Sequence, residues 1–427
     1  MIFPFKGLRY NTEKVNIKDV VSQPYDIITS EMQDFYYGKS PYNIVRIILN
    51  KDENKYESAV WYLREWMRSG ILTVEKEPAI YLYEQIFSVQ GAKLRRRSFI
   101  ALLRLSRLED GVVFPHEHTL SGPKEDRFRL TLATNAHWGQ IFMLYDDKNN
   151  DIGRLLSPMY GDPPEFSFTD EDDVVHTFWV VKDPNVHKML RDAMRDMKFV
   201  IADGHHRYET ALRYKEYMDN LNGQRDDAPW NYRMVTLVSF QDPGLQIFPI
   251  HRLVKGMDVP ELSALNKHFA MVKVETLERL RKMLIGAMNA GKKGTIGVFG
   301  RKIGYYYLEL RDIEDALNTG DRTHSDMWKQ LDVNILQNLV MEPLLGMSVE
   351  QIKNSGNISY TSSFVDANRM VESGEYEMCF FLNPIRKEQV RDISLNGELL
   401  PQKSTFFYPK VLTGLVEQYM GMSDGGE

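Results

Sequence analysis

The stretch "KFVIADGHHRYETALRYKEY", residues 198–217, decides how this chain is interpreted. Its apolar start, Phe199 to Ala202, predicts a short buried strand, and the pattern from Tyr208 to Leu221 predicts a helix. Between them stands the polar run Asp203-Gly204-His205-His206-Arg207. A glycine at such a junction permits close backbone approach or a left-handed conformation. We therefore expect a strand–turn–helix unit with polar side chains gathered at the turn.

This polar turn has the chemistry of a phosphate site. The first turn of a helix presents unpaired N–H groups and a dipole that favours an anion. His205, His206 and Arg207 add donors there, and arginine can bind a phosphate or carboxylate through two parallel hydrogen bonds. Asp203, on the strand side, could orient a histidine, hold Mg²⁺ or act as a base. The structural alternative is an aspartate that caps the helix while the histidines face solvent.

A second polar stretch is "VFPHEHTLSGPKEDRFRLTL", residues 113–132. If its start is a strand, His116 and His118 share one face and Glu117 points the other way. Metal binding by the two histidines is the weaker interpretation, because a two-residue spacing alone is common by chance. We expect a polar catalytic loop that supplies Lys124, Asp126 and Arg127 as well. The alternative is a solvated loop before an ordinary amphipathic helix.

Three further segments combine polar groups with apolar runs. His251 and Arg252 follow a strand-like run, with a domain-joining segment as the alternative to a binding role. Gln23-Pro24-Tyr25-Asp26 is a turn before an apolar pair, for which a structural role is equally open. In "PQKSTFFYPK", residues 401–410, Lys403, Ser404 and Thr405 offer an ammonium and two hydroxyls, and the aromatic run after them favours a core segment over a base-stacking surface.

Composition excludes several classes of protein. The 427 residues carry a net charge of -6, which argues against a nucleic-acid partner. The dense basic run, Arg95-Arg96-Arg97, follows Gly91 and is expected in a solvated hairpin turn. No run approaches the roughly 18 apolar residues that span a membrane, so no membrane partner is expected. The single cysteine, Cys379, lies in an apolar segment, and we expect an inert buried thiol in a cytoplasmic protein.

Strand and helix signals alternate along the chain, which predicts a mixed α+β fold. The texture changes near residue 256, so we expect an N-terminal α+β domain over residues 1–255 that carries the phosphate-binding turn, and a C-terminal α+β domain over residues 256–427. The predicted helices and hairpins are helices 56–68, 186–197, 208–221, 275–290 and 327–345, and hairpins 80–105 and 295–310. The sequence contains no G-x-x-x-x-G-K-[ST], no G-x-G-x-x-G and no H-E-x-x-H, so it supports neither a P-loop, a dinucleotide fold nor a zinc protease.

Eight segments in order resemble the bacterial and archaeal domain of unknown function 1015 family, from about residue 3 to residue 416. They are "PFKGLRYN", "QPYDIIT", "SPYNIVRIIL", "PHEHTLSGPKEDR", "ADGHHRYETAL", "PGLQIFPIHRLV", "LDVNIL" and "PQKSTFFYPK". The box "VIADGHHRYETAL" is also similar to the Asp-Gly-His-His-Arg box of the archaeal free-serine kinases. That resemblance implies a ParB/sulfiredoxin-like fold, in which the strand–turn–helix binds nucleotide phosphates.

The second resemblance implies that Gly204, His205, His206 and Arg207 cradle phosphate and that Asp203 lies beside the transferred group. Chemistry adds Lys124 and Arg127 as phosphate-binding cations and Glu117 as catalytic base, with Asp203 also the expected Mg²⁺ ligand. His206 is the third catalytic candidate. The residues expected to bind substrate are His116, Asp126, His251 and Arg252.

We thus expect a small-molecule kinase that transfers a phosphoryl group from a nucleotide, ATP or ADP, to the hydroxyl of a small metabolite, with serine first. Mg²⁺ and the nucleotide are the expected cofactors. Two alternatives stay open. One is a phosphohydrolase that uses the same site with water as acceptor, and the other is a nucleotide-sensing regulatory protein without turnover.

Overall fold

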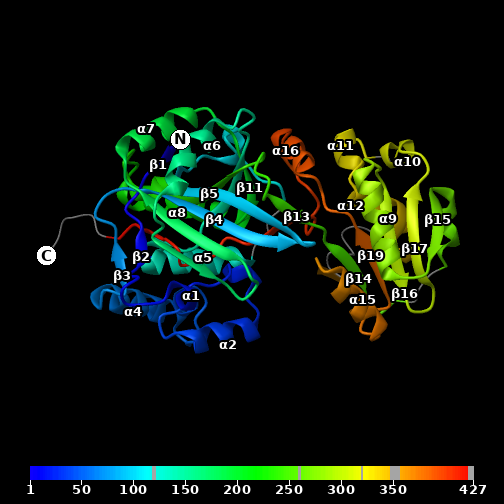
Figure 1. Cartoon of the computed structure of the whole chain (residues 1–427), viewed down its shortest axis with the longest axis horizontal. Coiled ribbons are helices and arrows are strands. Elements are labelled where there is room, and N and C mark those ends of the chain that lie inside the picture. Colours follow the sequence, from blue (N-terminus) through cyan, green and yellow to red (C-terminus); the bar gives the residue numbers. More distant parts are fainter. Residues whose placement is uncertain (118–121, 258–260, 319–320, 347–355, 422–427) are drawn as a thin grey trace. The chain divides into compact units, whose positions relative to one another are not determined.

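The chain forms two compact units (Figure 1). The structure, a computed structural model, describes residues 1–117, 122–257, 261–318, 321–346 and 356–421. The first unit contains Met1–Pro115, Thr119–Gln246 and Pro409–Glu427, and the second contains His116–His118 and Ile247–Tyr408. Where the sequence predicts one boundary near residue 256, these units change at residue 247, and the chain rejoins the first unit at residue 409. It rejoins because β21 (Gln418–Tyr419) pairs with β7 (Ala136–His137).

A nine-stranded mixed sheet lies at the centre of the first unit's described residues. The strand order is β6-β11-β8-β12-β5-β4-β10-β9, and β1 pairs with β5. These strands are β1 (Ile2–Phe3), β4 (Ile80–Val89), β5 (Ala92–Arg104), β6 (Val113–Phe114), β8 (Ile141–Tyr145), β9 (Phe166–Thr169), β10 (Val175–Val181), β11 (Phe199–Asp203) and β12 (Tyr232–Ser239). The β4–β5 hairpin turns at Gln90 and Gly91, whose φ angles of 52° and 82° are both left-handed, as a two-residue hairpin requires.

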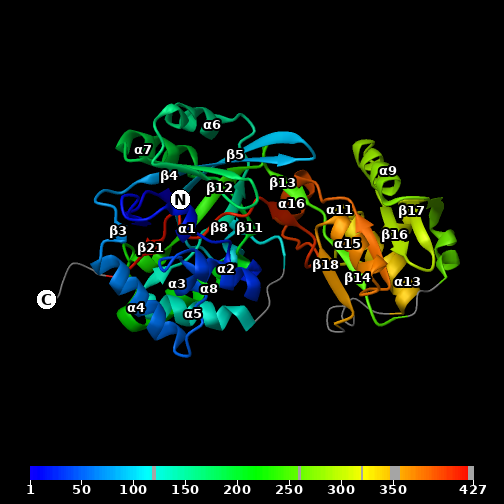
Figure 2. The same cartoon turned by 60° about the horizontal axis from the view of Figure 1, so that its bottom comes forward.

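Helices cover this sheet and bury alternate strand residues. Buried core residues come from the strands, among them Leu82, Phe99, Met143, Ile201 and Leu237, and from helices α6 (Asp151–Leu156), α7 (Pro184–Ala193) and α8 (His205–Asn222). Figure 2 shows α6 and α7 on the opposite side of the first unit's sheet from the N-terminal helices. Those helices are α1 (Ile17–Val20), α2 (Ser30–Lys39), α3 (Val45–Ile48) and α4 (Lys55–Arg68). Helix α5 (Gly122–Thr134) packs along both α4 and α8.

The second unit has a six-stranded sheet among its described residues, in the order β15-β17-β16-β19-β14-β18. These strands are β14 (His251–Val254), β15 (Phe269–Val274), β16 (Thr295–Gly300), β17 (Gly304–Leu310), β18 (Ile358–Thr361) and β19 (Met378–Leu382). Helices α9 (Leu277–Asn289) and α15 (Phe364–Glu372) pack their apolar faces on it. The remaining elements include the pair β13 (Gln246–Phe248) and β20 (Phe406–Tyr408), together with α10 (Glu314–Leu317) and α16 (Lys387–Leu395).

The structure confirms the mixed α+β fold but corrects one predicted element. The predicted helix from Met327 to Leu345 is broken into α11 (Asp326–Lys329), α12 (Asp332–Ile335), a π-helical turn (Leu336–Met341) and α13 (Glu342–Leu345). The break falls at Leu331, whose backbone is extended, with ψ at 133°. The carboxylate of Asp332 accepts a hydrogen bond of 2.7 Å from the Gly294 N–H. This tertiary contact accompanies the break in the predicted helix.

In the part of the chain that the structure describes, no helix combines the length and the apolar character needed to cross a membrane. Cys379 lies in β19 as predicted and is fully buried, and burial raises the pKa of its thiol well above the ordinary value.

Candidate functional site

The Asp203-Gly204 turn joins β11, the second strand from one edge of the first unit's sheet, to that unit's longest described helix. Strand β11 runs one residue further than predicted, to Asp203, and α8 begins three residues earlier, at His205. His205, His206 and Arg207 are therefore its first helical turn. Gly204 has a φ of 95°, and a Cβ atom at this position would lie 2.9 Å from the Arg207 Nε atom. Glycine is needed here both for the left-handed backbone and for the guanidinium that covers it.

Two cations grip the Asp203 carboxylate. The Lys410 ammonium donates to one oxygen at 2.8 Å, and the Arg207 Nη2 group donates to the other at 2.5 Å. Burial by itself would raise the pKa of Asp203, but the charges of Lys410 and Arg207 outweigh burial and hold this pKa well below its ordinary value. Asp203 is thus ionised at neutral pH with both oxygens engaged. Arg207 Nη1 also donates to the Gln140 carbonyl oxygen, which fixes the guanidinium plane.

Helix α5 brings the predicted residues Lys124, Asp126 and Arg127 beside this turn. Lys124 forms an ion pair with Glu209 of α8. Arg127 Nε donates to Asp126 at 2.9 Å, and the second Asp126 oxygen accepts the Tyr56 hydroxyl at 3.0 Å. The Lys124–Glu209 ion pair therefore joins α5 to α8, and the Tyr56–Asp126 hydrogen bond joins α5 to α4. The N-terminal part of α5 and the first half of α8 therefore lie side by side in the first unit.

Tyr25 and Asp26, in a short 3-10 turn (Tyr25–Ile27), face the same cations. The Arg127 guanidinium lies 4.2 Å from the centre of the Tyr25 ring. Burial would lower the pKa of Arg207, and the negative charges of Asp26 and Asp203 raise it above its ordinary value instead. Asp26 is exposed and has no hydrogen-bond or ion-pair partner among the described residues. Asp26 was not among the predicted site residues, although its Gln-Pro-Tyr-Asp turn stood out in the sequence.

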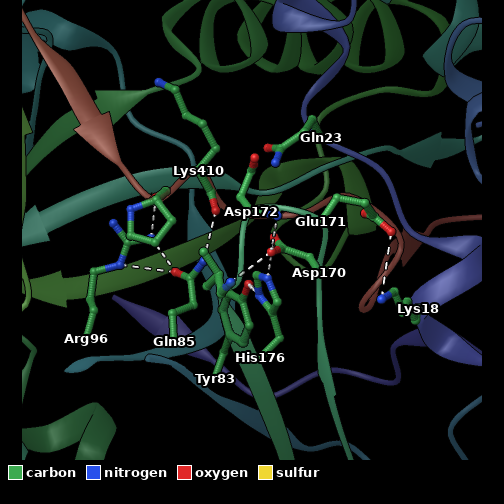
Figure 3. A network of polar contacts seen from close by, with 12 residues as sticks. Lys18, Gln23, Tyr83, Gln85, Arg96, Asp170, Glu171, Asp172, His176 and Lys410 are labelled. Carbon is green, nitrogen blue, oxygen red and sulfur yellow. Dashed lines mark hydrogen bonds and ion pairs between the residues drawn. The ribbon is translucent and has the colours of Figure 1, made fainter. Parts of the chain in front are cut away.

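A buried polar network places Lys410, as Figure 3 shows. Arg96 donates to the Gln85 side-chain oxygen and, at 2.5 Å, to the Pro409 carbonyl, while Gln85 Nε2 donates at 2.9 Å to the Lys410 carbonyl. The predicted solvated turn for Arg95–Arg97 is wrong, since the run lies within β5 and Arg96 is only 1% exposed. Alternation along the strand turns Arg96 inward, where it holds the segment that carries Lys410.

A pocket of about 310 Å³ borders the same network. It lies between α1, α2 and the β9–β10 hairpin, and its walls include the aromatic residues Phe35, Tyr36 and Phe168 and the polar residues Gln23, Lys39 and Asp172. Behind it the Asp170 carboxylate contacts His176 Nε2 at 2.8 Å, and His176 Nδ1 contacts the Tyr83 hydroxyl at 2.6 Å (Figure 3). Such a pocket has the size and the mixed aromatic and polar lining of a small-molecule site.

The other predicted site residues lie in the second unit. His116 Nε2 is 2.8 Å from the Thr405 hydroxyl, and Glu117 forms a parallel bridge with Leu400. These contacts join His116 and Glu117 to residues 400 and 405, next to or within the other predicted segment. His118 lies outside the described residues, so a metal pair with His116 stays a prediction.

His251 and Arg252 lie in β14, between β19 and the edge strand β18 of the second unit's sheet. His251 is fully buried, with ring centres of Phe364 and Phe381 at 4.2 and 5.2 Å, and its Nδ1 accepts the Leu382 N–H at 3.2 Å. Burial and the Arg252 charge lower the pKa of His251 to about 3. Arg252 donates to the Ile250 carbonyl. Their surroundings are those of core residues, and a role in substrate binding stays a prediction.

Among the described residues, no group of three or more His, Cys, Asp and Glu side chains could hold a metal ion. Asp203 would have to release Lys410 or Arg207 to bind Mg²⁺. Asp26 is the carboxylate near the turn that needs no such exchange. Mg²⁺ is usually held by one or two carboxylates together with phosphate oxygens, and Asp26 supplies one such carboxylate near Arg207.

The chain belongs to the family described as Protein of unknown function (DUF1015), whose model matches residues 2–334. The predicted family membership is therefore confirmed. No curated protein matches the chain in sequence.

Solved structures similar to the chain include a free serine kinase in complex with ADP, at 12% identity and a TM-score of 0.36, covering 69% of this chain and 83% of that one. SbnI with a C-terminal truncation from Staphylococcus aureus is 11% identical with a TM-score of 0.36, covering 76% and 90%. A conserved hypothetical protein from Pyrococcus furiosus is 14% identical with a TM-score of 0.32, covering 70% and 88%. A likeness of this size says nothing about individual site residues.

Proposed function

We propose that the first unit binds a nucleotide and transfers a phosphoryl group from it to the hydroxyl of a small metabolite, with serine the first acceptor to test. The observation that carries the proposal is the convergence of Lys410, Arg207 and Arg127 on the Asp203-Gly204 turn. These cations come from three distant segments of the chain. Phosphoryl transfer depends mainly on positioning and on neutralising the charge of the phosphates, which is what such a cluster supplies.

The nucleotide phosphates would bind at the turn and the nucleoside in the pocket of about 310 Å³. Two chain segments connect these places. Gln23 lines the pocket and Tyr25 contacts Arg127, while Leu412 lines the pocket and Lys410 contacts Asp203. Two residues span at most about 7 Å, so one nucleotide can reach from one place to the other.

Each residue near the turn has a proposed task. Gly204, His205, Arg207, Lys124 and Arg127 bind phosphate oxygens. Asp203 holds Lys410 and Arg207 in place, and one of these two ion pairs breaks so that its cation can bind the phosphates.

The catalytic base is either Glu117, as chemistry suggests from the sequence, or Asp26, whose free carboxylate lies in the field of Arg207. His206 is the candidate for proton transfer at the phosphate, and Asp126, His116, His251 and Arg252 are the substrate-binding candidates. Mg²⁺, when bound with the nucleotide, would neutralise phosphate charge, with Asp26 or Asp203 as its protein ligand.

One observation favours the sensor alternative. Both Asp203 oxygens are engaged, so Asp203 itself is not free to act as a base beside the transferred group. A protein that only binds nucleotide needs the cations and no base. The hydrolase alternative uses the same groups with water as acceptor.

Titration calorimetry with ADP, ATP and AMP, followed by phosphorus NMR with and without L-serine, separates these functions. A kinase gives phosphoserine that depends on both nucleotide and serine. Inorganic phosphate without an acceptor indicates a hydrolase, and binding without product over hours indicates a sensor. Absence of nucleotide binding at millimolar concentration would overturn the proposal.

A further inference from the structure

A second, smaller cavity lies inside the first unit, between α5, α8 and strands β7 and β12. Its lining residues are Arg127, Leu130, Thr131, His137, Trp138, Arg207, Thr210 and Arg233. About 20 Å³ of it is open to the centre of a water molecule. That is room for a water or for one small polar group, and much less than a nucleotide needs.

Arg233 presents an unpaired charge to this cavity. The residue is 1% exposed, and its Nη2 group donates to the Gly139 carbonyl at 2.5 Å. Its Nε and Nη1 groups have no partner within the described chain, where Arg233 also forms no ion pair. A buried charge that lacks a partner is costly, so a counter-ion is expected at these two nitrogens.

Two more polar atoms around the cavity have no hydrogen-bond partner among the residues that the structure describes. They are the Thr210 hydroxyl and His137 Nε2, on residues that are 4% and 3% exposed. Burial, and then the charge of Arg233, lowers the pKa of His137 well below its ordinary value, so the ring is neutral at pH 7 and one nitrogen can donate. The walls therefore offer hydrogen-bond donors from three different elements.

The acids nearby do not balance the arginines. Arg127 is paired with Asp126, and Arg207 shares Asp203 with Lys410. The carboxylate closest in effect to Arg233 is that of Glu417, which accepts the Gly139 and Gly414 N–H groups at 2.6 and 2.8 Å. Burial raises the pKa of Glu417 to about 7, so Glu417 is only partly ionised at neutral pH. The cavity keeps an excess of positive charge.

We propose that this cavity binds one small oxyanion through the Nε and Nη1 groups of Arg233, with Thr210 and His137 as further donors. The Nε–Nη1 edge of a guanidinium gives two parallel hydrogen bonds to a carboxylate or a phosphate. The anion has two chemical sources: the carboxylate of a small organic acid, or free inorganic phosphate. A carboxylate source would define the acceptor of the proposed phosphoryl transfer as an amino or hydroxy acid, and only that last step rests on the proposed function.

Calorimetry on the full chain with four probes distinguishes the sources. The probes are L-serine, serinol, which lacks the carboxylate, sodium acetate and inorganic phosphate. We expect saturable binding of one oxyanion. Binding of serine and acetate but not serinol identifies a carboxylate site, and binding of phosphate alone identifies a phosphate site.

Three variants locate the binding. Arg233→Met should lower the affinity for the anion by roughly tenfold or more, the loss expected for charge-assisted hydrogen bonds. Thr210→Val should weaken it several-fold. Thr236→Val is the matched control, because the Thr236 hydroxyl is also buried and has no partner among the described residues but does not line the cavity. The Thr236→Val variant should bind the anion as tightly as the native protein does.

If Arg233→Met fails to fold, the anion affinities of Thr210→Val and Thr236→Val are compared instead, and only Thr210→Val should bind more weakly. Absence of binding by acetate, serine and phosphate at millimolar concentration would overturn the inference, and so would binding that is unchanged in folded Arg233→Met and Thr210→Val. The nucleotide titration uses other ligands than these probes, and Arg233 and Thr210 have no task in the proposed nucleotide site. Loss of nucleotide binding with retained anion binding therefore removes the proposed kinase and leaves this site standing.

Discussion

The ammonium of Lys410 lies 2.8 Å from a carboxylate oxygen of Asp203, although 207 positions separate the two residues. Their side chains are 10% and 19% exposed. The segment that carries Lys410 therefore contributes to the same site as the Asp-Gly-His-His-Arg run. Since the backbone at Pro409 and Lys410 is held by Arg96 and Gln85, the position of this ammonium is set by the sheet.

Lys410→Met should reduce nucleotide affinity by roughly tenfold or more, because a phosphate would lose a charge-assisted hydrogen bond. It should also lower the free energy of unfolding by about 3 kcal/mol, since a largely buried carboxylate loses one of its two cations. Urea unfolding and calorimetry on the same preparation measure both effects.

The control is Lys188→Met. Lys188 pairs with Asp192 on α7 at 2.7 Å, but its side chain is 71% exposed. An exposed pair is worth about 0.2–1 kcal/mol, so stability should change little and nucleotide affinity should stay the same. Equal effects of the two substitutions would mean that the Lys410–Asp203 contact has no special role.

Arg96→Met should weaken nucleotide binding without removing any group that touches the phosphates. It leaves the Gln85 side chain and the Pro409 carbonyl without their donor, at a cost of about 1–3 kcal/mol for each buried group, and it loosens the segment that carries Lys410. Its neighbour Arg95, whose side chain is 56% exposed, provides the matched control Arg95→Met. Thermal unfolding and nucleotide titration should separate the neighbours. If they behave alike, Arg96 does not position Lys410.

These two arginines also show where sequence reasoning succeeds and where it stops. The predicted β4–β5 hairpin is present, since apolar periodicity and a Gln-Gly turn suffice to define it. The predicted width of the turn was wrong. Gln90 and Gly91 close the hairpin alone, so Arg95–Arg97 fall inside β5, where every second side chain is buried. A run of three arginines suggests solvent, and only the partner strand shows that Arg96 has acceptors inside.

Like the hairpin, the candidate site could be predicted from the sequence only in part. The strand–turn–helix at Asp203 follows from local pattern, and the approach of α5 follows from its unexplained polar residues. Lys410 could not be found, because its aromatic neighbours suggested core and its partner is remote in sequence. Asp26 lies in a turn whose polar residues have an ordinary structural explanation, and its closeness to Arg207 depends on tertiary packing.

The second unit should lose stability in acid through His251. Its folded pKa is about 3 and its ordinary value is 6.5, so the unfolded chain binds the proton more strongly. Stability is fully present above about pH 6.5 and falls as the pH drops toward 3. His251→Asn keeps an acceptor for the Leu382 N–H and removes the titrating group, so it should flatten the decline between pH 6.5 and pH 4 in urea unfolding.

His324→Asn is the control, because it removes a histidine of the same unit whose side chain is 35% exposed, whereas His251 is fully buried. The same pair of variants tests the predicted role of His251 in substrate binding. A rise in the acceptor KM in His251→Asn, with unfolding unchanged, would favour that role over a core residue. An unaltered pH slope in His251→Asn would contradict the proposed cause of acid lability.

Asp26→Asn and Glu117→Gln together identify the catalytic base. Each keeps the shape of the side chain and removes its charge, so the variant that lacks the base should lose roughly a hundredfold or more in kcat with little change in nucleotide affinity.

Asp203→Asn should behave differently, because Asp203 holds Lys410 and Arg207. Its removal should lower stability and nucleotide affinity together. Asp34→Asn, on a side chain that is 69% exposed in α2, controls for loss of a surface carboxylate and should keep full activity.

A loss of kcat in Asp26→Asn alone would move the chemistry to the 3-10 turn beside Arg207, and a loss in Glu117→Gln alone would keep it on the His-Glu-His stretch. Normal turnover in both variants would show that neither is the base. If no product forms even in the native protein while nucleotide binds, the free carboxylate of Asp26 has no catalytic task, and nucleotide sensing replaces phosphoryl transfer as the function of the turn.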